Sequence, residues 1–359
     1  MNAPLEFNGT DPFTGEPIRF WMHDGVVSTE PIAGANVAVA RGWIVPGLVD
    51  AHNHVGIAPG LGVTIERARE LAAQDLRAGT MLIREVGSPV DTHPLDADAH
   101  GPRFLRSGKH IARPKRYLRD YGVELDDPDQ LAAEVAVQAR AGDGWVKLVG
   151  DWIDREVGDL APLWSREQLV AAVEAAHANG ARITAHVFGA EALPDIIAAG
   201  FDSIEHGTGL DEDLIDQLVE RDIALVPTLI QLETFPEIAA GADRFPKYKQ
   251  NMLSLHAGRH EVFARAREAG VRIYAGTDAG GTIKHGRIVD EVEALTTIGF
   301  SPLQALAAAS TAPRDWLGAP GIVHGARADF LVLDSDPAED LSTLRRPLHI
   351  VCGGEKIPA

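Results

Sequence analysis

The chain has 359 residues, a length that suits one large α/β domain with a small appendage. Hydrophobic residues make up 45% and charged residues 24%, which is ordinary globular composition and excludes a disordered or collagen-like chain. The formal net charge of −19 disfavours a nucleic-acid or anionic membrane partner. We therefore expect the partner to be a small-molecule substrate.

Cysteine content and the N-terminal residues bear on the compartment. The single cysteine, Cys352, cannot form an intrachain disulfide, which suits a reducing environment. The first residues lack the charged and apolar regions of a signal peptide, and no apolar run approaches the roughly 18 residues of a membrane span. We expect a cytoplasmic protein without a membrane partner, and the sequence is compatible with a homo-oligomer.

Short β-rich apolar runs alternate with stretches of helical periodicity, as in repeated βα units. The predicted strands span residues 44–50, 80–86, 102–107, 145–149, 182–187, 202–206, 223–228 and 271–278. Helix signals lie between them. Ser165 and Gln168 predict a capping box with Gly180 ending that helix, Ser301 before a proline opens another helix, and apolar spacing predicts one over 211–220.

Eight strands are the number that a closed barrel requires, so the fold class predicted is α/β, a (β/α)8 TIM barrel over residues 44–319. Residues 1–43 and 320–359 depart from this rhythm and consist of short, glycine-rich strands. We expect these two ends to pair into a small β domain beside the barrel. A simpler alternative is that they are separate extensions of the barrel edges.

Polar residues occur at the carboxyl ends of the predicted barrel strands, where the chemistry of such barrels takes place. These candidates are His52, His54, Lys147, His186, His206 and Asp278. Taken singly, the histidines are explained as hydrogen-bonded core or turn residues and Asp278 as a helix cap. Taken together, their repeated placement favours a metal site. His52 and His54 share one strand face, and a charged lysine inside the apolar run WVKLV would be costly if left unpaired.

Five segments of the chain carry a family resemblance: PGLVDAHNHVG, WVKL, TAHVFGAEALPDIIAAGFDSIEHGTGL, AGVRIYAGTDAGGTIKHG and ADFLVLDSDP. Together they resemble the amidohydrolase superfamily, in its imidazolonepropionase-like and prolidase-like branch of Xaa-Pro or Xaa-Arg dipeptidase type. The resemblance implies a binuclear metal centre. His52 and His54 would hold one metal with Asp278, His186 and His206 the other, and a carboxylated Lys147 would bridge them.

This implied centre is chemically coherent. A neutral lysine amine adds CO2 to give a carbamate, whose two oxygens can bridge two divalent ions. The ligand set suits zinc, and manganese, cobalt or iron would also be accepted. A hydroxide shared by the metals would attack the substrate, with Asp278 as the catalytic acid–base residue. We expect hydrolysis of an amide or related C–N bond in a dipeptide, N-acyl amino acid, lactam or aryl amide.

The chain departs from the dipeptidase-like pattern around the expected substrate side. Residues 107–127 form a basic and aromatic loop, in which Arg113, Arg116 and Tyr117, with Lys115, are candidates to bind a substrate carboxylate. An exposed basic loop without a ligand is an equally simple reading. Trp152 and His285 are further candidates for substrate contact. Glu85 stands where relatives carry an aspartate, and we assign it only a structural role.

Two alternatives remain open on the sequence. A mononuclear zinc deaminase of the same superfamily would need no carboxylated lysine, and Glu191, five residues after His186, would then shuttle protons. Such an enzyme leaves Lys147 without a purpose. The other alternative is a non-catalytic barrel relative, which is disfavoured because such proteins lose metal ligands and this chain keeps them.

Overall fold

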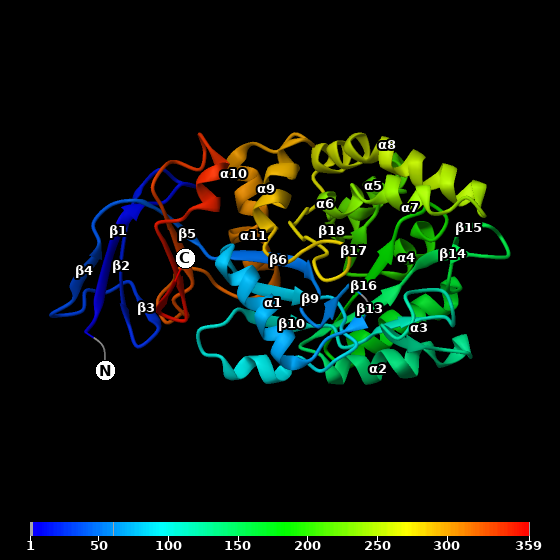
Figure 1. Cartoon of the computed structure of the whole chain (residues 1–359), viewed down its shortest axis with the longest axis horizontal. Helices are drawn as coiled ribbons and strands as arrows, with labels where there is room; N and C mark the ends of the chain where they lie inside the picture. Colours follow the sequence, from blue (N-terminus) through cyan, green and yellow to red (C-terminus); the bar gives the residue numbers. More distant parts are fainter. Residues whose placement is uncertain (1–2, 60, 359) are drawn as a thin grey trace.

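The computed structural model describes residues 3–59 and 61–358, so the outermost positions of the expected terminal domain (1, 2 and 359) lie outside it. The chain has a mixed α/β fold (Figure 1). Parallel strands form two sheets, one of order β10-β9-β6 and one of order β12-β11-β13-β16-β17-β18. Their bounds are β6 Leu48–Asn53, β9 Thr80–Glu85, β10 Arg103–Arg106, β11 His110–Ala112, β12 Gly122–Glu124, β13 Trp145–Val149, β16 Arg182–Val187, β17 Ser203–His206 and β18 Ala224–Val226.

The first predicted strand, 44–50, is divided in two. Residues Trp43–Pro46 form β5, which pairs with strands of the terminal segments, and β6 begins only at Leu48. Gly47 lies at the break, where an added Cβ would come within 2.3 Å of the Met81 sulfur. A glycine is therefore needed at position 47, because the chain passes close to the Met81 side chain where it leaves one sheet for the other.

The prediction of a regular strand over 271–278 is wrong, but this segment lies at the position expected for that strand. Within it, Ile273 makes a single bridge to Leu225, and Ala279, directly after the segment, bridges Asn53. Its backbone is bonded on both sides. Tyr274 N donates to Leu225 O (3.0 Å) in β18, and Ala275 O accepts from Ala51 N (2.9 Å) in β6. The segment thus connects the outer strands of the two parallel sheets.

The third predicted strand, 102–107, is found as β10, and the residues after it make the other connection between these sheets. Strand β10 pairs with β9, and the chain then continues into β11, which was not predicted and in which Ile111 pairs with Leu148 of β13. Gly108 lies between β10 and β11 with a φ of +68°, a left-handed conformation that favours glycine. The chain therefore turns at Gly108 where it leaves one sheet for the other.

Helices follow most of the parallel strands and cover them on the outside (Figure 1). They are α1 Ile65–Arg77, α2 Leu131–Ala141, α3 Arg166–Ala178, α4 Leu193–Ala199, α5 Glu212–Glu220, α6 Leu229–Leu232, α7 Phe235–Ala240, α8 Pro246–Ala269, α9 Ile288–Thr296, α10 Pro302–Ala308 and α11 Thr311–Leu317, with short 3-10 turns at His93–Ala97, Pro128–Gln130 and Leu341–Arg345.

The sequence signals for three of these helices are confirmed. The capping box at Ser165 and Gln168 opens α3, and Gly180 follows its end with a φ of +72°. Ser301 caps α10 in the same way. Helix α5 buries Leu214, Ile215 and Leu218 against the sheet, and its hydrophobic Val219 is exposed. Among the described helices, none is long and apolar enough to cross a lipid bilayer.

Strands from both ends of the chain form one further sheet, of order β21-β20-β19-β5-β1-β2-β3 with β4 beside β1 (Figure 1). Its strands are β1 Leu5–Thr10, β2 Pro17–His23, β3 Val26–Ser28, β4 Asn36–Val39, β5, β19 Phe330–Leu333, β20 His349–Cys352 and β21 Glu355–Ile357. Phe7, Phe20 and Phe330 pack together with ring centroids 4.8 to 5.2 Å apart. That this sheet makes a separate domain, with the boundaries expected above, stays a prediction.

Two antiparallel pairs lie beyond the carboxyl ends of the parallel strands. One joins β7 (Ile57–Ala58) to β8 (Leu61–Gly62), and the other joins β14 (Asp151–Asp154) to β15 (Asp159–Pro162). The β14–β15 hairpin follows β13 directly and stands at the edge of the cavity described below. These pairs therefore belong to the functional end of the sheet rather than to its core.

We expect Phe330→Ala to lower the free energy of unfolding by about 3–5 kcal/mol, since it removes the ring shared by the two ends of the chain. Urea denaturation followed by circular dichroism measures this loss. The matched control is Val37→Ala in β4, whose side chain is exposed and whose change we expect to stay within about 0.5 kcal/mol. Equal, small losses for both variants would contradict the role given to the aromatic cluster.

Candidate metal centre and substrate cavity

The candidate metal ligands gather at the carboxyl ends of the parallel strands. His52 lies in β6 with His54 just after it, His186 lies in β16, His206 ends β17, and Asp278 is the last residue of the segment 271–278. The four imidazoles are buried, and the Asp278 side chain is 21% exposed. Residues far apart in the sequence thus meet at one place because parallel strands end at the same edge.

The side-chain atoms converge closely. His52 Nε2 lies 3.2 Å from His54 Nε2 and 3.2 Å from Asp278 Oδ1, and His54 Nε2 lies 3.1 Å from the same oxygen. His206 joins them, since ligand atoms of His52, His206 and Asp278 lie within 4.8 Å of one another. The ring centroids of His186 and His206 are 4.7 Å apart. Five of the six predicted ligands therefore form one cluster.

The far side of three of the four imidazoles is held by a neighbouring group. His54 Nδ1 contacts Gly87 O (2.8 Å), His206 Nδ1 contacts Thr228 Oγ1 (2.8 Å), and His52 Nδ1 contacts a Glu205 carboxylate oxygen (2.7 Å). A carbonyl or carboxylate can only accept, so Nδ1 of His52 and His54 must carry the proton. Their Nε2 atoms, which face the cluster, then present lone pairs suited to metal ligation.

Burial favours the neutral form of three of the four imidazoles. It lowers the pKa of His54, and it holds the pKa values of His186 and His206 well below the usual value, with neighbouring positive charges adding to the effect. For Asp278, burial opposes ionisation, but His52 and His54 outweigh it and hold its pKa well below the usual range. Neutral histidines and an ionised aspartate are the protonation states that metal ligands need.

Lys147, the sixth predicted ligand, lies in the middle of β13 and is buried. No ion pair or hydrogen bond of its amine is found among the described residues. Burial, with a smaller contribution from the charge of Arg84, lowers the pKa of Lys147 to about 8, against the opposing effect of the Glu205 and Asp278 carboxylates. Lys147 is near enough to lower the pKa of His54, His186 and His206, which places it beside the cluster.

Behind the cluster lies a buried ion pair that the sequence reasoning missed. The Glu205 carboxylate contacts Arg84 and the Thr184 hydroxyl in addition to His52. The Arg84 guanidinium in turn lies over the rings of Trp145 (4.4 Å) and Trp316 (4.8 Å). A signal was present in the sequence, because Arg84 and Glu205 are charged residues inside apolar predicted strands.

The backbone is strained at the same place. His206, Thr228 and Asp278 have φ values of +69°, +51° and +55°, which non-glycine residues seldom adopt. All three residues belong to the cluster or hold one of its imidazoles. Such strain typically collects at functional sites, where surrounding contacts maintain it.

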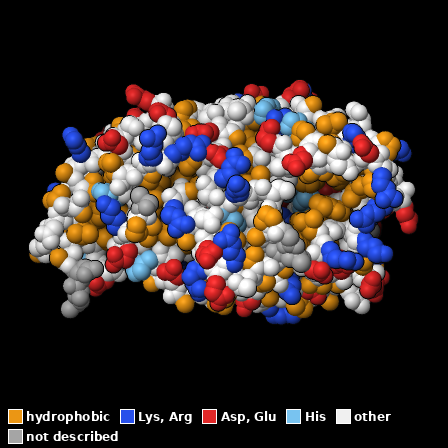
Figure 2. Space-filling model, viewed as in Figure 1, with side chains coloured by type: hydrophobic (Ala, Val, Ile, Leu, Met, Phe, Trp, Pro, Cys, Tyr) orange, Lys and Arg blue, Asp and Glu red, His pale blue; other side chains and the backbone are white. Residues whose placement is uncertain are grey.

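A cavity of about 490 Å³ opens beside the cluster. Its wall includes His54, His186 and Asp278 together with aromatic and aliphatic side chains, namely Ile57, Pro59, Tyr117, Leu118, Tyr121, Trp152, Phe188, Ile238 and Tyr248. The surface is hollowed over β16 and β17, where hydrophobic side chains gather and Lys and Arg side chains lie farther out (Figure 2). The cavity is the natural place for a substrate to meet the cluster.

The substrate-binding candidates separate in the structure. Tyr117 and Trp152 line this cavity, with ring centroids 4.8 Å apart. Arg113 and Arg116 line a different cavity of about 580 Å³ together with Lys115. Arg116 is bound to Asp154 (2.8 Å) and to Ala161 O (2.9 Å), so its guanidinium holds the β14–β15 hairpin.

His285 and Glu191 also lie away from the described wall of the substrate cavity. His285 is buried, and its Nδ1 lies 2.8 Å from an Asp75 carboxylate oxygen. Glu191, on which the deaminase alternative depends, is exposed. The positions of Arg113, Arg116 and His285 therefore do not support a direct contact with a substrate held at the cluster.

His110 is a cavity residue that the sequence reasoning missed. It is buried and lies against His54 and Tyr117, with ring centroids 5.3 and 5.1 Å apart. Neither of its ring nitrogens has a hydrogen-bond partner among the described residues. In the sequence, His110 lies inside the basic loop 107–127, in which the nearby arginines were the residues predicted to bind a substrate.

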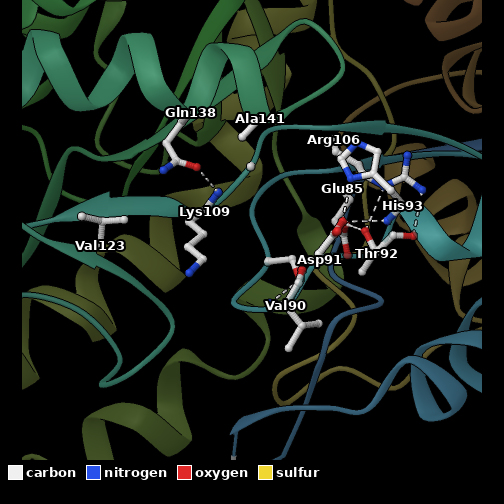
Figure 3. Close-up of a pocket in the computed structure, with 12 residues that line it drawn as sticks. Glu85, Val90, Asp91, Thr92, His93, Arg106, Lys109, Val123, Gln138 and Ala141 are labelled. Carbon is white, nitrogen blue, oxygen red and sulfur yellow. Dashed lines mark hydrogen bonds and ion pairs between the residues drawn. The ribbon is translucent and has the colours of Figure 1, made fainter.

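A separate cavity of about 450 Å³ surrounds Glu85 (Figure 3). Glu85 accepts hydrogen bonds from Gly56 N (3.0 Å) and from the Thr92 hydroxyl, and Arg106 binds Thr92 Oγ1 (2.9 Å). Burial raises the pKa of Glu85 to about 7. None of the candidate metal ligands lines this cavity, and the hydrogen bonds of Glu85 fit the structural role expected for it.

Comparison with known proteins gives the family. Residues 43–357 match the model of the amidohydrolase family, so the chain belongs to that family. It is accordingly a hydrolase acting on carbon–nitrogen bonds, as the sequence motifs predicted.

Individual relatives agree with this placement. An uncharacterized protein of Mycobacterium tuberculosis is 53% identical over 337 residues, which cover 94% of this chain and 91% of that protein. The ochratoxinase of Aspergillus niger is 28% identical over 64% of this chain and 49% of its own, and its crystal structure superposes with a TM-score of 0.81, covering 99% and 95% of the two chains. A Xaa-Pro dipeptidase structure has a TM-score of 0.81 at 23% identity, covering 99% and 100%.

We expect Gly276→Ala to displace His52, because the added Cβ would lie 2.7 Å from the His52 Cβ and 2.5 Å from Val226 Cγ1. The expected result is a folded protein that binds less divalent metal per chain, measured by elemental analysis after dialysis. Gly258→Ala in α8 is the matched control, since a Cβ there meets open space. Normal metal content in Gly276→Ala would show that His52 is not held by this contact.

We expect Glu205→Gln to lower the free energy of unfolding by about 3–5 kcal/mol, because Arg84 would remain charged and buried without its partner. Chemical denaturation measures the change. The control is Glu293→Gln, which removes a carboxylate from the exposed pair with Arg345, where we expect a loss of about 1 kcal/mol or less. Similar losses in both variants would contradict the importance of the buried pair.

Proposed function

We propose that the parallel strands form a closed (β/α)8 barrel and that the protein is a binuclear metal-dependent amidohydrolase. The observation that carries the proposal is the convergence of the His52 and His54 Nε2 atoms on Asp278, with the Nδ1 atoms of the same rings bound from behind. The two sheets, joined through segments 103–112 and 271–278, support the barrel.

The donor set fits two divalent ions. His52, His54 and Asp278 would hold one ion, and His186 with His206 would hold the other. The buried His186 Nε2, which has no partner among the described residues, is the donor atom that such an ion would satisfy. We propose zinc, since four imidazoles with carboxylate-type oxygens suit it, with manganese, cobalt or iron as alternatives.

Lys147 fits the role of a bridging carbamate. Because burial lowers its pKa to about 8, a useful fraction of the amine is neutral near neutral pH. The nitrogen lone pair attacks CO2, a C–N bond forms, and one amine proton is released, which leaves an anion with two oxygens. The modification would replace a buried amine that makes no ion pair among the described residues by an anionic group able to hold divalent ions.

When bound, the metals would lower the pKa of a coordinated water and polarise the substrate carbonyl. Asp278, held ionised beside His52 and His54, accepts the proton of the attacking water. It then passes this proton to the nitrogen of the departing amine as the C–N bond breaks. The aromatic side chains around the cavity limit access of other water to the site.

We propose further that the protein acts on a small molecule in the cytoplasm. The net charge of −19 and the single cysteine are the observations that support this setting. The ochratoxinase and the Xaa-Pro dipeptidase, as named, support amides or peptides as the bond type. The deaminase alternative has less support, because Glu191 is exposed and Lys147 would have no role.

Metal analysis and carbamate detection test this proposal together. Protein loaded with zinc in the presence of 13C-bicarbonate is expected to bind two ions per chain, to show a carbamate signal by 13C NMR, and to hydrolyse aryl amides. In Lys147→Ala the signal should disappear, and activity should fall by more than the roughly 10- to 100-fold typical of losing an outer-shell partner. Lys109→Ala, at an exposed lysine, is the control. One ion per chain and no carbamate would favour the deaminase.

A further inference from the structure

We infer that the substrate is an amide with a bulky aromatic acyl group and no charged end group inside the cavity, and that Gln231 recognises a neutral polar group on it. This inference rests on the proposed function and specifies the substrate class of the same site. It rests on three features of the described cavity residues, which are their aromatic character, the absence of Lys and Arg side chains among them, and the Gln231 amide oxygen, which has no partner there.

The aromatic character of the wall favours an aromatic substrate. Tyr117, Tyr121 and Trp152 line one side, with Tyr117 in edge contact with Trp152 at 4.8 Å. Phe188 lies next to His206, with ring centroids 4.7 Å apart, so one aromatic wall reaches the cluster itself. Edge and face contacts with such rings stabilise an aromatic group beyond the effect of burial alone. The volume of about 490 Å³ is large for a small aliphatic dipeptide.

Charge in the wall disfavours a zwitterion. Among the described residues that line the cavity there is no lysine or arginine, and the only carboxylate is Asp278, which belongs to the proposed metal centre. The nearest basic candidate, Arg116, is engaged by Asp154 and by backbone carbonyls. The carboxylate of a free dipeptide would find no cationic side chain among the described wall residues and only neutral hydrogen-bond donors such as His110. Asp278 is the one carboxylate in the described wall that faces its ammonium, so burying both charges here is costly.

Gln231 offers a neutral recognition group. Its side chain is 7% exposed and lines the cavity, and its Oε1 has no hydrogen-bond partner among the described residues. The residue is held firmly, because its N–H donates to Thr228 O (2.9 Å) in the strained turn after β18. The start of the same helix, α6, is fixed by the Glu291 carboxylate, which accepts from Leu229 N (2.8 Å) and Ile230 N (2.9 Å).

A side-chain amide both donates and accepts, so it complements an amide or carbonyl group of a neutral substrate. A site built to make such hydrogen bonds discriminates strongly against analogues that lack the partner, because the protein group is then left unsatisfied. We therefore assign Gln231 as a specificity-determining residue that contacts the substrate, with no part in the chemical step.

Three probes of the zinc- and bicarbonate-loaded full chain test the substrate class. They are N-(2-naphthoyl)-phenylalanine amide, which is neutral and aromatic, naphthylalanyl-phenylalanine, which is a zwitterion of similar size, and N-acetyl-alanine amide, which is neutral and small. Hydrolysis of each acyl–nitrogen bond is followed by chromatography, and binding by calorimetry. We expect kcat/KM for the first probe to exceed that for either of the others by about 100-fold, near the cost of leaving buried groups unpartnered.

The outcomes separate this inference from the proposed function. If the zwitterion or the small amide is the better substrate, the inference fails while the hydrolase proposal stands. If none of the probes is hydrolysed, the hydrolase proposal loses support, and the calorimetric ranking of the probes still decides the inference. Tighter binding of the zwitterion than of the neutral aromatic amide would overturn it.

Variants of Gln231 test its assignment. Gln231→Leu, which keeps the size and removes the amide, is expected to raise KM for the naphthoyl probe about 10-fold or more, with kcat changed far less. Gln231→Asn should retain part of the affinity. The matched control is Gln250→Leu, at an exposed glutamine of α8, which should leave KM unchanged. The assignment would be overturned if folded Gln231→Leu kept an unchanged KM. It would also be overturned if kcat fell about 10-fold while KM stayed the same.

Discussion

The buried carboxylate of Glu205 connects the candidate metal centre to the core of the parallel sheets. It contacts both His52 and Arg84, and the Arg84 guanidinium lies over two tryptophan rings. Removing both charges from water is costly, so the pair depends on good geometry and further hydrogen bonds, which Thr184 and Ser203 supply. In return, the carboxylate holds the proton of His52 on Nδ1 and leaves Nε2 free. The charge arrangement of the core thus determines the protonation state of the site.

Backbone geometry places a second constraint on the site. His206, Thr228 and Asp278 occupy left-handed conformations, each of which typically costs on the order of 1–3 kcal/mol. Close packing opposes relaxation, since Gly276 and Gly280 approach His52 and His54 so closely that no Cβ would fit. Strain and close approach together position the histidines before any ligand binds, which reduces the reorganisation that binding would require.

The sequence was most informative where burial and strand direction decide the outcome. His52, His186, His206 and Lys147 end or occupy apolar parallel strands, so their convergence follows from topology alone. For loop residues, the sequence pattern did not determine where the side chains lie. Arg116 was expected to meet a substrate, but its orientation depends on Asp154, a partner in a hairpin that the sequence pattern did not predict. His110 and Gln231 were missed for a related reason, because the three-residue strand β11 and the four-residue helix α6 are too short to show a periodicity in the sequence.

The residues of the proposed metal centre and most residues of the cavity wall therefore come from different parts of the fold. The proposed chemistry comes from the ends of buried parallel strands, whereas much of the cavity wall comes from segments outside those strands, including the loop around Tyr117, the β14–β15 hairpin and α6 to α8. Arg116 shows how the two parts connect. Its guanidinium joins Asp154 to the carbonyls of Trp152 and Ala161, so it fixes the hairpin on which Trp152 meets Tyr117. The positive charge of the loop therefore shapes an aromatic surface, and its effect on a substrate is exerted through those rings rather than through an ion pair.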